Sequence, residues 1–369
     1  MPLANQEQHR MALCQPVDHF ISGQYRSAMR RAVTLAAGSL LIDDDKPPEL
    51  TAGQARLGVD VVGLCGSDYK LFHGGHPYGR FPYIQGHEFS GVVLEFSAGY
   101  DGPLAVGDRV AVEPLIPCGR CIACARGRSN CCVDLKVLGV HVPGALADEI
   151  AVATSALYPV DGLDMELAAL VEPVSIGLQA VVRGNVSATD TVVVLGAGPI
   201  GLAATLAASD IGARVLTVDI IAERLARAEV MGAELSVDTA TSDLAAAVAD
   251  FTGGAGATVV LDATGVPELI RSAFDLVAHS GSIVIVGISE KDVQIPVIQF
   301  SRKEVNVYGS RNNNGVFGRA VELVRAHQEE VRSWITHRIS LEELPDMIAY
   351  GAAHPETVEK MIVQVNEQS

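Results

Sequence analysis

Residues 196–201, GAGPIG, stand directly after the apolar run VVVL and directly before a segment with helical periodicity. In a turn between a strand and a helix, the first glycine of GxGxxG makes the tight turn, and the second lets a pyrophosphate approach the backbone. The third lets the helix pack on the strand, and the helix N-terminus binds phosphate through its free N–H groups. The feature predicts a dinucleotide site, although a glycine-rich turn that binds nothing is the alternative. The predicted cofactor-binding residues here are Gly196, Gly198, Pro199, Ile200 and Gly201.

The segment around this turn alternates apolar strands with amphipathic helices, from Thr191 to about Ser289. Such alternation is typical of a parallel, doubly wound sheet, whose ligands bind outside the carboxyl ends of the strands. Two later strand ends, residues 262–265 and 286–289, therefore either belong to the cofactor site or are plain turns. They add three predicted cofactor contacts, Thr264, Val286 and Gly287.

Asp219 ends the second strand of this region, eighteen positions beyond Gly201. A carboxylate at this place accepts hydrogen bonds from the adenosine ribose hydroxyls and repels a 2′-phosphate. NAD is therefore favoured over NADP. Arg224, on the following turn, is a further cofactor-binding candidate. Its guanidinium could tolerate a 2′-phosphate, which supports NADP as the weaker alternative.

The chain before this sheet consists of short β-type runs between about Ala32 and Val160, separated by Gly, Pro and Asp. These runs predict a compact, strand-rich domain of barrel type. After about Tyr308 the alternation ends, and a helical segment and a last strand follow, so we expect the chain to return to the first domain. The predicted division is an N-terminal extension at 1–28, a first domain at 29–175 that resumes at 311–369, and an NAD-binding domain at 176–310. The extension is expected to be disordered or used in subunit contacts, unless Met29 is the true first residue.

The formal net charge of −17 would repel nucleic-acid phosphates and anionic membrane surfaces. No stretch approaches the roughly 20 uninterrupted apolar residues of a membrane-spanning helix. The N-terminus also lacks the apolar core and the cleavage site of a secretory signal. We therefore expect a cytoplasmic protein without nucleic-acid or membrane partners. In that reducing compartment, clustered cysteines are more often metal ligands than disulfides.

Residues 118–132, CGRCIACARGRSNCC, hold five of the seven cysteines. Four thiolates on one loop can close a tetrahedron around Zn²⁺ with no open position, and such a closed site is structural. The predicted ligands are Cys118, Cys121, Cys124 and Cys132, with Cys131 left over. A set of disulfides and a zinc ribbon that binds nucleic acid are the alternatives, and the compartment and the acidic charge disfavour them.

A second set of candidate ligands is spread along the chain: Cys65, His87, Glu88 and Glu172. One sulfur, one imidazole and one carboxylate form a three-ligand zinc set that leaves a fourth position for water or substrate, as catalysis requires. Each residue alone also has a structural interpretation, because Cys65 could be a small buried hydrophobe, His87 a core histidine and Glu172 an acid at a helix start.

These motifs together resemble those of the zinc-dependent medium-chain dehydrogenases. The shared motifs occur in the family's order and are GLCGSD at 63–68, GHEFSG at 86–91, the four-cysteine lobe, VEPVSIG at 171–177 and GAGPIG at 196–201. The resemblance covers about residues 30 to 369. It is greatest to the polyol and sugar-acid branch, which includes sorbitol dehydrogenase and relatives that act on hexonates or galactitol.

The resemblance implies an α/β fold in which a GroES-like, β-rich catalytic domain is joined to a Rossmann coenzyme domain with a doubly wound parallel sheet. It also implies NAD as cofactor, catalytic and structural zinc, and a homodimer or homotetramer. Cys65 and His87 would be catalytic zinc ligands, and Glu88 and Glu172 would each bind zinc directly or stand behind it. Ser67 resembles the hydroxyl that receives the substrate proton, and Asp68 resembles the carboxylate that orients His87.

Some positions depart from the family pattern. Lys70 stands where alcohol dehydrogenases of this family often have a histidine that completes the proton relay, so Tyr69, Lys70 or the ribose with water must provide the exit. Gln179 stands where relatives often have histidine, and we assign it no role. His73 and His76 could be mistaken for metal ligands, but the family places a substrate-side loop here.

The resulting expectation is an enzyme that transfers a hydride from a secondary alcohol of a polyol, cyclitol or sugar acid to NAD⁺. A dehydrogenase for threonine or butanediol shares every ligand and is the first alternative. A non-enzymatic NAD-binding redox sensor is the second, and it gives no reason for Cys65, His87 and Glu172 to be present. The substrate itself depends on which side chains of residues 69–83, 138–145 and 310–317 face the zinc. The polar run 309–314 either binds substrate hydroxyls or a carboxylate, or is a solvated turn.

Overall fold

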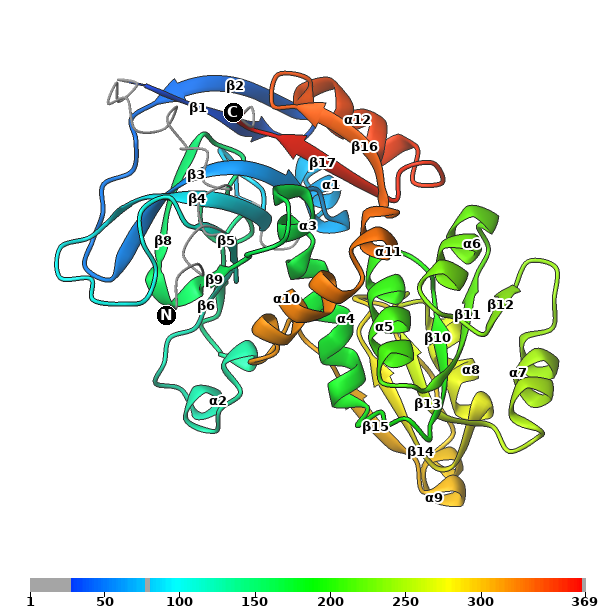
Figure 1. Cartoon of the computed structure of the whole chain (residues 1–369). Helices are drawn as coiled ribbons and strands as arrows, with labels where there is room; N and C mark the ends of the chain where they lie inside the picture. The colour runs from blue at the N-terminus through cyan, green and yellow to red at the C-terminus, as the bar shows by residue number, and fades with distance from the viewer. Residues whose placement is uncertain (1–27, 77–79, 367–369) are drawn as a thin grey trace, which may run out of the picture.

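The computed structural model describes residues 28–76 and 80–366. The predicted extension therefore lies outside the described residues, apart from its last position. Figure 1 shows two bodies, each with its own sheet, and a layer of helices between them. Within the described ranges, no helix is both long enough and apolar enough to cross a membrane.

A six-stranded parallel sheet forms the second body, with strand order β12-β11-β10-β13-β14-β15. The order reverses between β10 and β13, and this switch point is where doubly wound sheets bind ligands. Side chains of β10 alternate between two hydrophobic clusters, with Val192 and Val194 in one and Val193 and Leu195 in the other. Both faces are therefore buried, as in other parallel sheets. The strands are β10 (Thr191–Leu195), β11 (Arg214–Asp219), β12 (Leu235–Asp238), β13 (Ala257–Asp262), β14 (Val277–Ile285) and β15 (Asn306–Gly309).

Helices connect these strands, and their ends follow from local sequence. Pro199 and Pro267 each stand in the first helical turn, where the missing N–H has no intrahelical partner to lose. The Asp243 side chain accepts a hydrogen bond from the Ala246 amide, and Gly253 ends the same helix at a φ of 60°. The helices are α5 (Pro199–Asp210), α6 (Ala222–Val230), α7 (Leu244–Thr252), α8 (Pro267–Leu276) and α9 (Ile298–Lys303).

A seven-stranded sheet forms the first body, with the path β16-β17-β3-β4-β5-β9 and with β8 also paired to β3. The last strand, β17, runs antiparallel to β3, so the end of the chain pairs with the N-terminal half. Two short ribbons complete the strands, β1 with β2 and β6 with β7. The sheet strands are β3 (Gln54–Gly63), β4 (Glu88–Phe96), β5 (Arg109–Val112), β8 (Glu149–Ala153), β9 (Leu157–Pro159), β16 (Ile335–Ser340) and β17 (Lys360–Gln364). The ribbon strands are β1 (Met29–Ala36), β2 (Ser39–Asp45), β6 (Leu115–Ile116) and β7 (Lys136–Val137).

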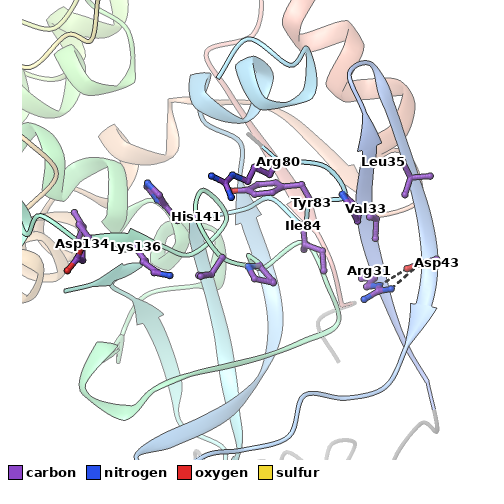
Figure 2. A pocket seen from close by; sticks show the side chains of 14 residues that line it. Arg31, Val33, Leu35, Asp43, Arg80, Tyr83, Ile84, Asp134, Lys136 and His141 are labelled. Carbon is purple, nitrogen blue, oxygen red and sulfur yellow. Dashed lines mark hydrogen bonds and ion pairs between the residues drawn. The ribbon is translucent and has the colours of Figure 1, made fainter. Parts of the chain in front are cut away.

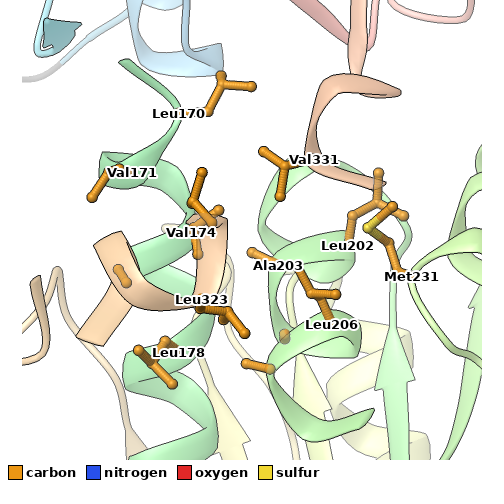
Figure 3. Packing of buried hydrophobic residues seen from close by; sticks show 14 of the residues in the cluster. Leu170, Val171, Val174, Leu178, Leu202, Ala203, Leu206, Met231, Leu323 and Val331 are labelled. Carbon is orange, nitrogen blue, oxygen red and sulfur yellow. The ribbon is translucent and has the colours of Figure 1, made fainter. Parts of the chain in front are cut away.

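The helical layer between the sheets is built around α4 (Val171–Arg183), which packs against α5 and α10 (Phe317–Ala326). Figure 3 shows Val174 and Leu178 of α4 on the side of that helix that faces Ala203 of α5. Gly177 allows this close packing, because a Cβ atom there would clash with Ala203. The remaining helices are α1 (Gly66–Phe72), α2 (Ile122–Ala125), α3 (Met165–Ala169), α11 (Gln328–Arg332), α12 (Leu344–Ala353) and the 3-10 turns η1 (Ser129–Cys131) and η2 (Thr154–Ala156).

One hydrophobic cluster includes residues of both sheets together with the helical layer, among them Val61, Val174 and Val194. The packing is therefore continuous from one sheet to the other. The predicted domain boundaries at residues 175 and 310 fall within or beside this layer, and they stay a prediction. The layer holds Glu172 on α4 and Gly201 on α5 in a fixed relation to each other.

Candidate active site

Cys65 lies just beyond the end of β3 and precedes the first residue of α1. Its backbone N–H donates a hydrogen bond to Oδ2 of Asp68, at 2.9 Å. Asp68 is fully buried, and its backbone oxygen accepts a hydrogen bond from Nε2 of Gln85, at 2.7 Å. The short helix therefore fixes the position of the thiol at its N-terminus and of the carboxylate one turn later.

His87 and Glu88 reach the same place from the next strand, because Glu88 pairs with Gly63 across β3 and β4. Gly63 is required here, since a Cβ atom would come 2.5 Å from Oε2 of Glu88. One ligand atom each from Cys65, His87 and Glu88 lies within 4.8 Å of the others. Three of the four predicted catalytic ligands thus come together at the ends of two adjacent strands.

His87 is buried among anionic groups. Burial alone would lower its pKa, but the charge of Asp68 and a hydrogen bond to Cys65 raise the pKa of this imidazole well above its ordinary value. Its Nδ1 atom lies 3.8 Å from Oδ2 of Asp68 and has no hydrogen-bond partner among the described residues. Its Nε2 atom lies 3.5 Å from Oγ of Ser67. An electron-rich pocket of sulfur, nitrogen and oxygen donors fits a divalent cation, and zinc takes this donor set.

Glu172 stands in the first turn of α4 and is buried, beside the cluster of Cys65, His87 and Glu88 but outside its 4.8 Å limit. Burial raises the pKa of this carboxyl to about 7, against the opposing charge of His87. Glu88, and not Glu172, belongs to the group whose ligand atoms all lie within 4.8 Å of one another.

Lys360 is a member of this site that sequence reasoning missed. Its Nζ atom donates hydrogen bonds to Oε2 of Glu88, at 2.6 Å, and to the backbone oxygen of Leu64, at 3.2 Å. The side chain is 2% exposed. A lysine directly before the apolar run MIV was the available signal, because a charge at the start of a buried strand needs a partner.

The four predicted lobe cysteines also come together: their sulfur atoms all lie within 4.8 Å of one another. The Sγ atoms of Cys121 and Cys124 are 3.5 Å apart, and the Cys118 amide donates to Sγ of Cys132, at 3.2 Å. Hydrogen bonds from backbone amides lower the pKa of Cys121 to about 6. Cys131 is exposed and outside the cluster. Among the described cysteines none is in a disulfide, and four convergent thiols fit a closed zinc site.

The polar run 309–314 holds this lobe against the rest of the chain. Nδ2 of Asn130 donates to the backbone oxygen of Arg311, at 2.7 Å, and Nδ2 of Asn314 donates to that of Gly127, at 3.1 Å. The Asn314 amide donates in turn to Oε1 of Gln179 on α4, at 3.2 Å. Gln179, to which sequence reasoning gave no role, therefore anchors this run.

The glycine turn has the geometry that a dinucleotide requires. Gly196 has a φ of 96°, and a Cβ atom at Gly201 would clash with the backbone oxygen of Gly196. Oδ2 of Asp219 accepts a hydrogen bond from the Ala197 amide, at 2.8 Å, so the acid at the end of β11 supports the turn. Oγ1 of Thr264 donates to Asp262, at 2.6 Å, which places Thr264 beside the same turn at the end of β13.

The other predicted cofactor contacts lie at the same sheet edge, but one is engaged elsewhere. The Val286 and Gly287 amides donate to the backbone oxygen of Asp262, at 2.8 and 3.1 Å. Arg224 forms an ion pair with Glu359, at 2.9 Å.

A cavity of about 760 Å³ opens between β1, the segment that starts at Arg80 and the loop that follows β7. Figure 2 shows Arg80 and Tyr83 extending toward His141 in this cavity. Nδ1 of His141 accepts a hydrogen bond from the Val137 amide, at 3.2 Å, so the ring proton of the neutral imidazole is on Nε2. Burial and the charge of Asp68 raise the pKa of Tyr83, which lines this cavity.

His73 and His76 belong to neither of the two groups of metal-ligand type found in the described part of the chain. His76 lies within the electrostatic reach of His87. Burial lowers the pKa of His76, and the charges of Lys70 and His87 lower it further. Burial likewise lowers the pKa of His141, with a further contribution from the charge of His76.

Two family models match the chain: the alcohol dehydrogenase GroES-like domain at residues 51–162 and the zinc-binding dehydrogenase at residues 199–326. An uncharacterized zinc-type alcohol dehydrogenase-like protein of Haemophilus influenzae is 34% identical over 333 residues, which cover 90% of this chain and 97% of that protein. The chain belongs to the zinc-type alcohol dehydrogenase family.

Two further relatives of this dehydrogenase are informative. The 2-dehydro-3-deoxy-L-galactonate 5-dehydrogenase of Pseudoalteromonas atlantica is 34% identical and covers 86% of this chain and 93% of its own length. The crystal structure of a zinc-binding dehydrogenase from Sinorhizobium meliloti, bound to NADP, superposes with a TM-score of 0.86 and is 32% identical. It covers 92% of this chain and 100% of its own.

The predicted fold class, a GroES-like domain with a Rossmann domain, is therefore confirmed. This dehydrogenase is an oxidoreductase of CH–OH donors, and its family binds zinc. Solved structures similar to it hold NADH or NADP.

Proposed function

We propose that this dehydrogenase oxidises a secondary alcohol of a polyol, cyclitol or sugar acid, with NAD⁺ as the hydride acceptor. The observation that carries the proposal is the convergence of Cys65, His87 and Glu88 at the ends of β3 and β4. A relative that is 34% identical carries the name of a sugar-acid dehydrogenase. A threonine or butanediol dehydrogenase would use the same ligands and is the alternative.

In this proposal, Cys65 and His87 hold the catalytic zinc together with Glu88 or Glu172. Bound zinc supplies Lewis acidity, which lowers the pKa of a substrate hydroxyl. The buried carboxylate of Asp68, 3.8 Å from Nδ1 of His87, orients the imidazole. Glu88 is the better candidate for the third ligand, since it belongs to the tight cluster and Glu172 does not.

Ser67 receives the proton of the substrate hydroxyl. Its Oγ atom lies 3.5 Å from Nε2 of His87, on the side of the imidazole that faces away from Asp68. The proton then leaves through Tyr69, Lys70 or the coenzyme ribose with water. Lys70 is exposed and lies three positions after Ser67 on the same short helix.

The cavity shown in Figure 2 has cationic residues in its wall, and their charge favours a sugar acid among the candidate substrates. Arg80 and Lys136 supply positive charge to its wall. Arg31 contributes less, because it is paired with Asp43. Cations and N–H donors around one cavity suit the carboxylate of a hexonate better than the hydroxyls of a neutral polyol.

Asp219 supports NAD as the preferred coenzyme. Its carboxylate stands at the end of β11, where the adenosine ribose of a bound dinucleotide is expected, and it would repel a 2′-phosphate. The preference belongs to this chain rather than to the family, since the Sinorhizobium meliloti structure holds NADP.

We also propose that the four lobe cysteines bind structural zinc, and that the protein is a cytoplasmic homodimer or homotetramer. Strand β15 is the edge of its sheet, and Val307 on it is 42% exposed. The segment that leads to it exposes Val297 by 82% and Ile298 by 60%. An apolar strand edge in contact with a second copy would be protected from non-specific pairing.

The test uses a panel of hexonates, hexitols, inositols, threonine and butanediol. NADH formation is measured with each compound before and after metal removal. We expect turnover of at least one polyol or sugar acid that is lost on chelation and returns with zinc. Cys65→Ser should abolish it, whereas a redox sensor would be unaffected by that change. Preference for threonine or butanediol would select the alternative, and no metal-dependent reduction of NAD⁺ with any alcohol would refute both.

A further inference from the structure

Glu359 is a buried acid to which the proposed chemistry gives no role. It directly precedes β17, and its side chain is 2% exposed. Its Oε2 atom accepts a hydrogen bond from Nε of Arg224, at 2.9 Å, and lies 3.7 Å from Nη1 of Arg227. The backbone oxygen of Pro355 accepts a second hydrogen bond from Arg224, at 2.9 Å. The segment before β17 therefore engages two arginines of α6.

These contacts cross from one sheet to the other at the coenzyme site. Helix α6 begins three residues after Asp219, the acid at the end of β11. A Cβ atom on Gly198, in the glycine turn, would lie 4.0 Å from Oε1 of Glu359. That oxygen has no hydrogen-bond partner among the described residues. Glu359 therefore approaches the turn with one carboxylate oxygen while the other holds the arginines.

The arginines are the groups on which coenzyme choice depends. A phosphate on the adenosine ribose adds nearly two negative charges near neutral pH, and it needs cationic donors to replace its hydration. Arg224 and Arg227 are the two cations that α6 offers. Paired with Glu359, their charge is already partly neutralised, and Glu359 together with Asp219 makes two carboxylates that would face the added phosphate.

We propose that Glu359 is a positioning residue for coenzyme choice, which disfavours NADP by keeping Arg224 and Arg227 paired and unable to bind a 2′-phosphate. The proposal rests on the proposed NAD-dependent function and adds a determinant outside the NAD-binding segment. Asp219 and Glu359 then act on the same phosphate from two sheets. A change in coenzyme preference would require a substitution in the return segment as well as at the end of β11.

The experiment measures dissociation constants of NADH, NADPH and adenosine 2′,5′-bisphosphate by calorimetry, without substrate. In Glu359→Gln, which keeps the shape and removes the charge, we expect the NADPH and bisphosphate dissociation constants to fall about tenfold. The NADH value should stay within about twofold. The double variant Glu359→Gln with Arg224→Ala should lose the tighter binding of NADPH and of the bisphosphate. Glu359→Asp, which keeps the charge, should retain the preference of the original protein for NADH over NADPH.

Glu356→Gln is the matched control, because Glu356 is an exposed acid on the same segment. If Glu359→Gln does not fold, Glu359→Thr carries the same expectation. If the dissociation constants of NADH and NADPH change by the same factor, or if neither changes, the role of Glu359 is overturned and the dehydrogenase function is left intact. Failure of the unaltered protein to bind either coenzyme would instead overturn the proposed function together with this inference.

Discussion

Lys360 and Glu88 form a buried ion pair at 2.6 Å between residues that are 272 positions apart in the chain. β17 supplies the lysine and β4 the carboxylate, and both strands pair with β3. The cation neutralises one member of the candidate zinc cluster and joins the end of the chain to the site.

Lys360→Met should lower the free energy of unfolding by about 3 kcal/mol, because it leaves the buried Glu88 carboxylate without its counter-charge. Urea unfolding followed by circular dichroism measures this change. Adding Glu88→Gln to Lys360→Met should restore part of the loss, as a double-mutant cycle would show. A Lys360→Met protein as stable as the original would contradict the importance of the pair.

Cys132→Ser should lose the structural zinc, whereas Cys131→Ser should retain it. Only Cys132 has its sulfur within 4.8 Å of those of Cys118, Cys121 and Cys124. Metal analysis of each purified variant counts the zinc per chain, and a chelator separates the labile class from the retained one. Loss of zinc in both variants, or in neither, would contradict the assignment.

Asp60→Asn should stabilise the protein at neutral pH and lose this advantage as the pH falls. Burial raises the pKa of Asp60 from 3.8 to about 6, against the opposing charge of Arg109. Folding raises the pKa of Asp60, so the ionised carboxylate destabilises the folded protein. This destabilisation is absent at pH values below the pKa of the unfolded state and complete above the pKa of the folded state. It amounts to about 3 kcal/mol near pH 7.5 and about 1 kcal/mol near pH 4.5.

The measurement for Asp60→Asn is urea unfolding of the variant and the original protein at both pH values. Asp101→Asn serves as a control at an exposed acid. A difference between variant and original that is the same at the two pH values would show that Asp60 is not the titrating group.

Arg80→Ala should raise KM for a sugar acid about tenfold and leave kcat nearly unchanged, because a charge-assisted hydrogen bond to the substrate carboxylate is lost in the ground state and transition state alike. KM for a neutral hexitol should change little. Steady-state kinetics with both substrates separate the two effects, and Lys291→Ala is the control at an exposed cation outside the cavity. Equal effects on both substrates would argue against recognition of the carboxylate by this wall.

Most of the candidate site could be predicted because short motifs bring their own geometry. The glycine turn between β10 and α5 was predicted from six residues, since the required φ angles and close approaches can be met only by glycine at those positions. The four lobe cysteines lie on one loop, where spacing alone restricts the sulfur positions. The fold class followed from the alternation of strands and helices, and the family relationship confirms it.

Residues that act across the fold could not be found in this way. Lys360 and Glu359 are adjacent in sequence, yet one contacts Glu88 on β4 and the other contacts Arg224 on α6. Gln179 likewise gained its role only through Asn314, 135 positions away. Nothing local marks these partners, because burial and distance are consequences of how the strands pair.

By itself, the sequence determined the two-part α/β fold, the glycine turn and the two sets of candidate metal ligands. Only the folded chain brings Glu88 within 4.8 Å of Cys65 and His87 and gives it Lys360 as an ion-pair partner. The reason is physical: backbone propensity and hydrophobic periodicity act over a few residues, whereas charges and ligand atoms interact with whatever the folded chain places within a few ångströms of them.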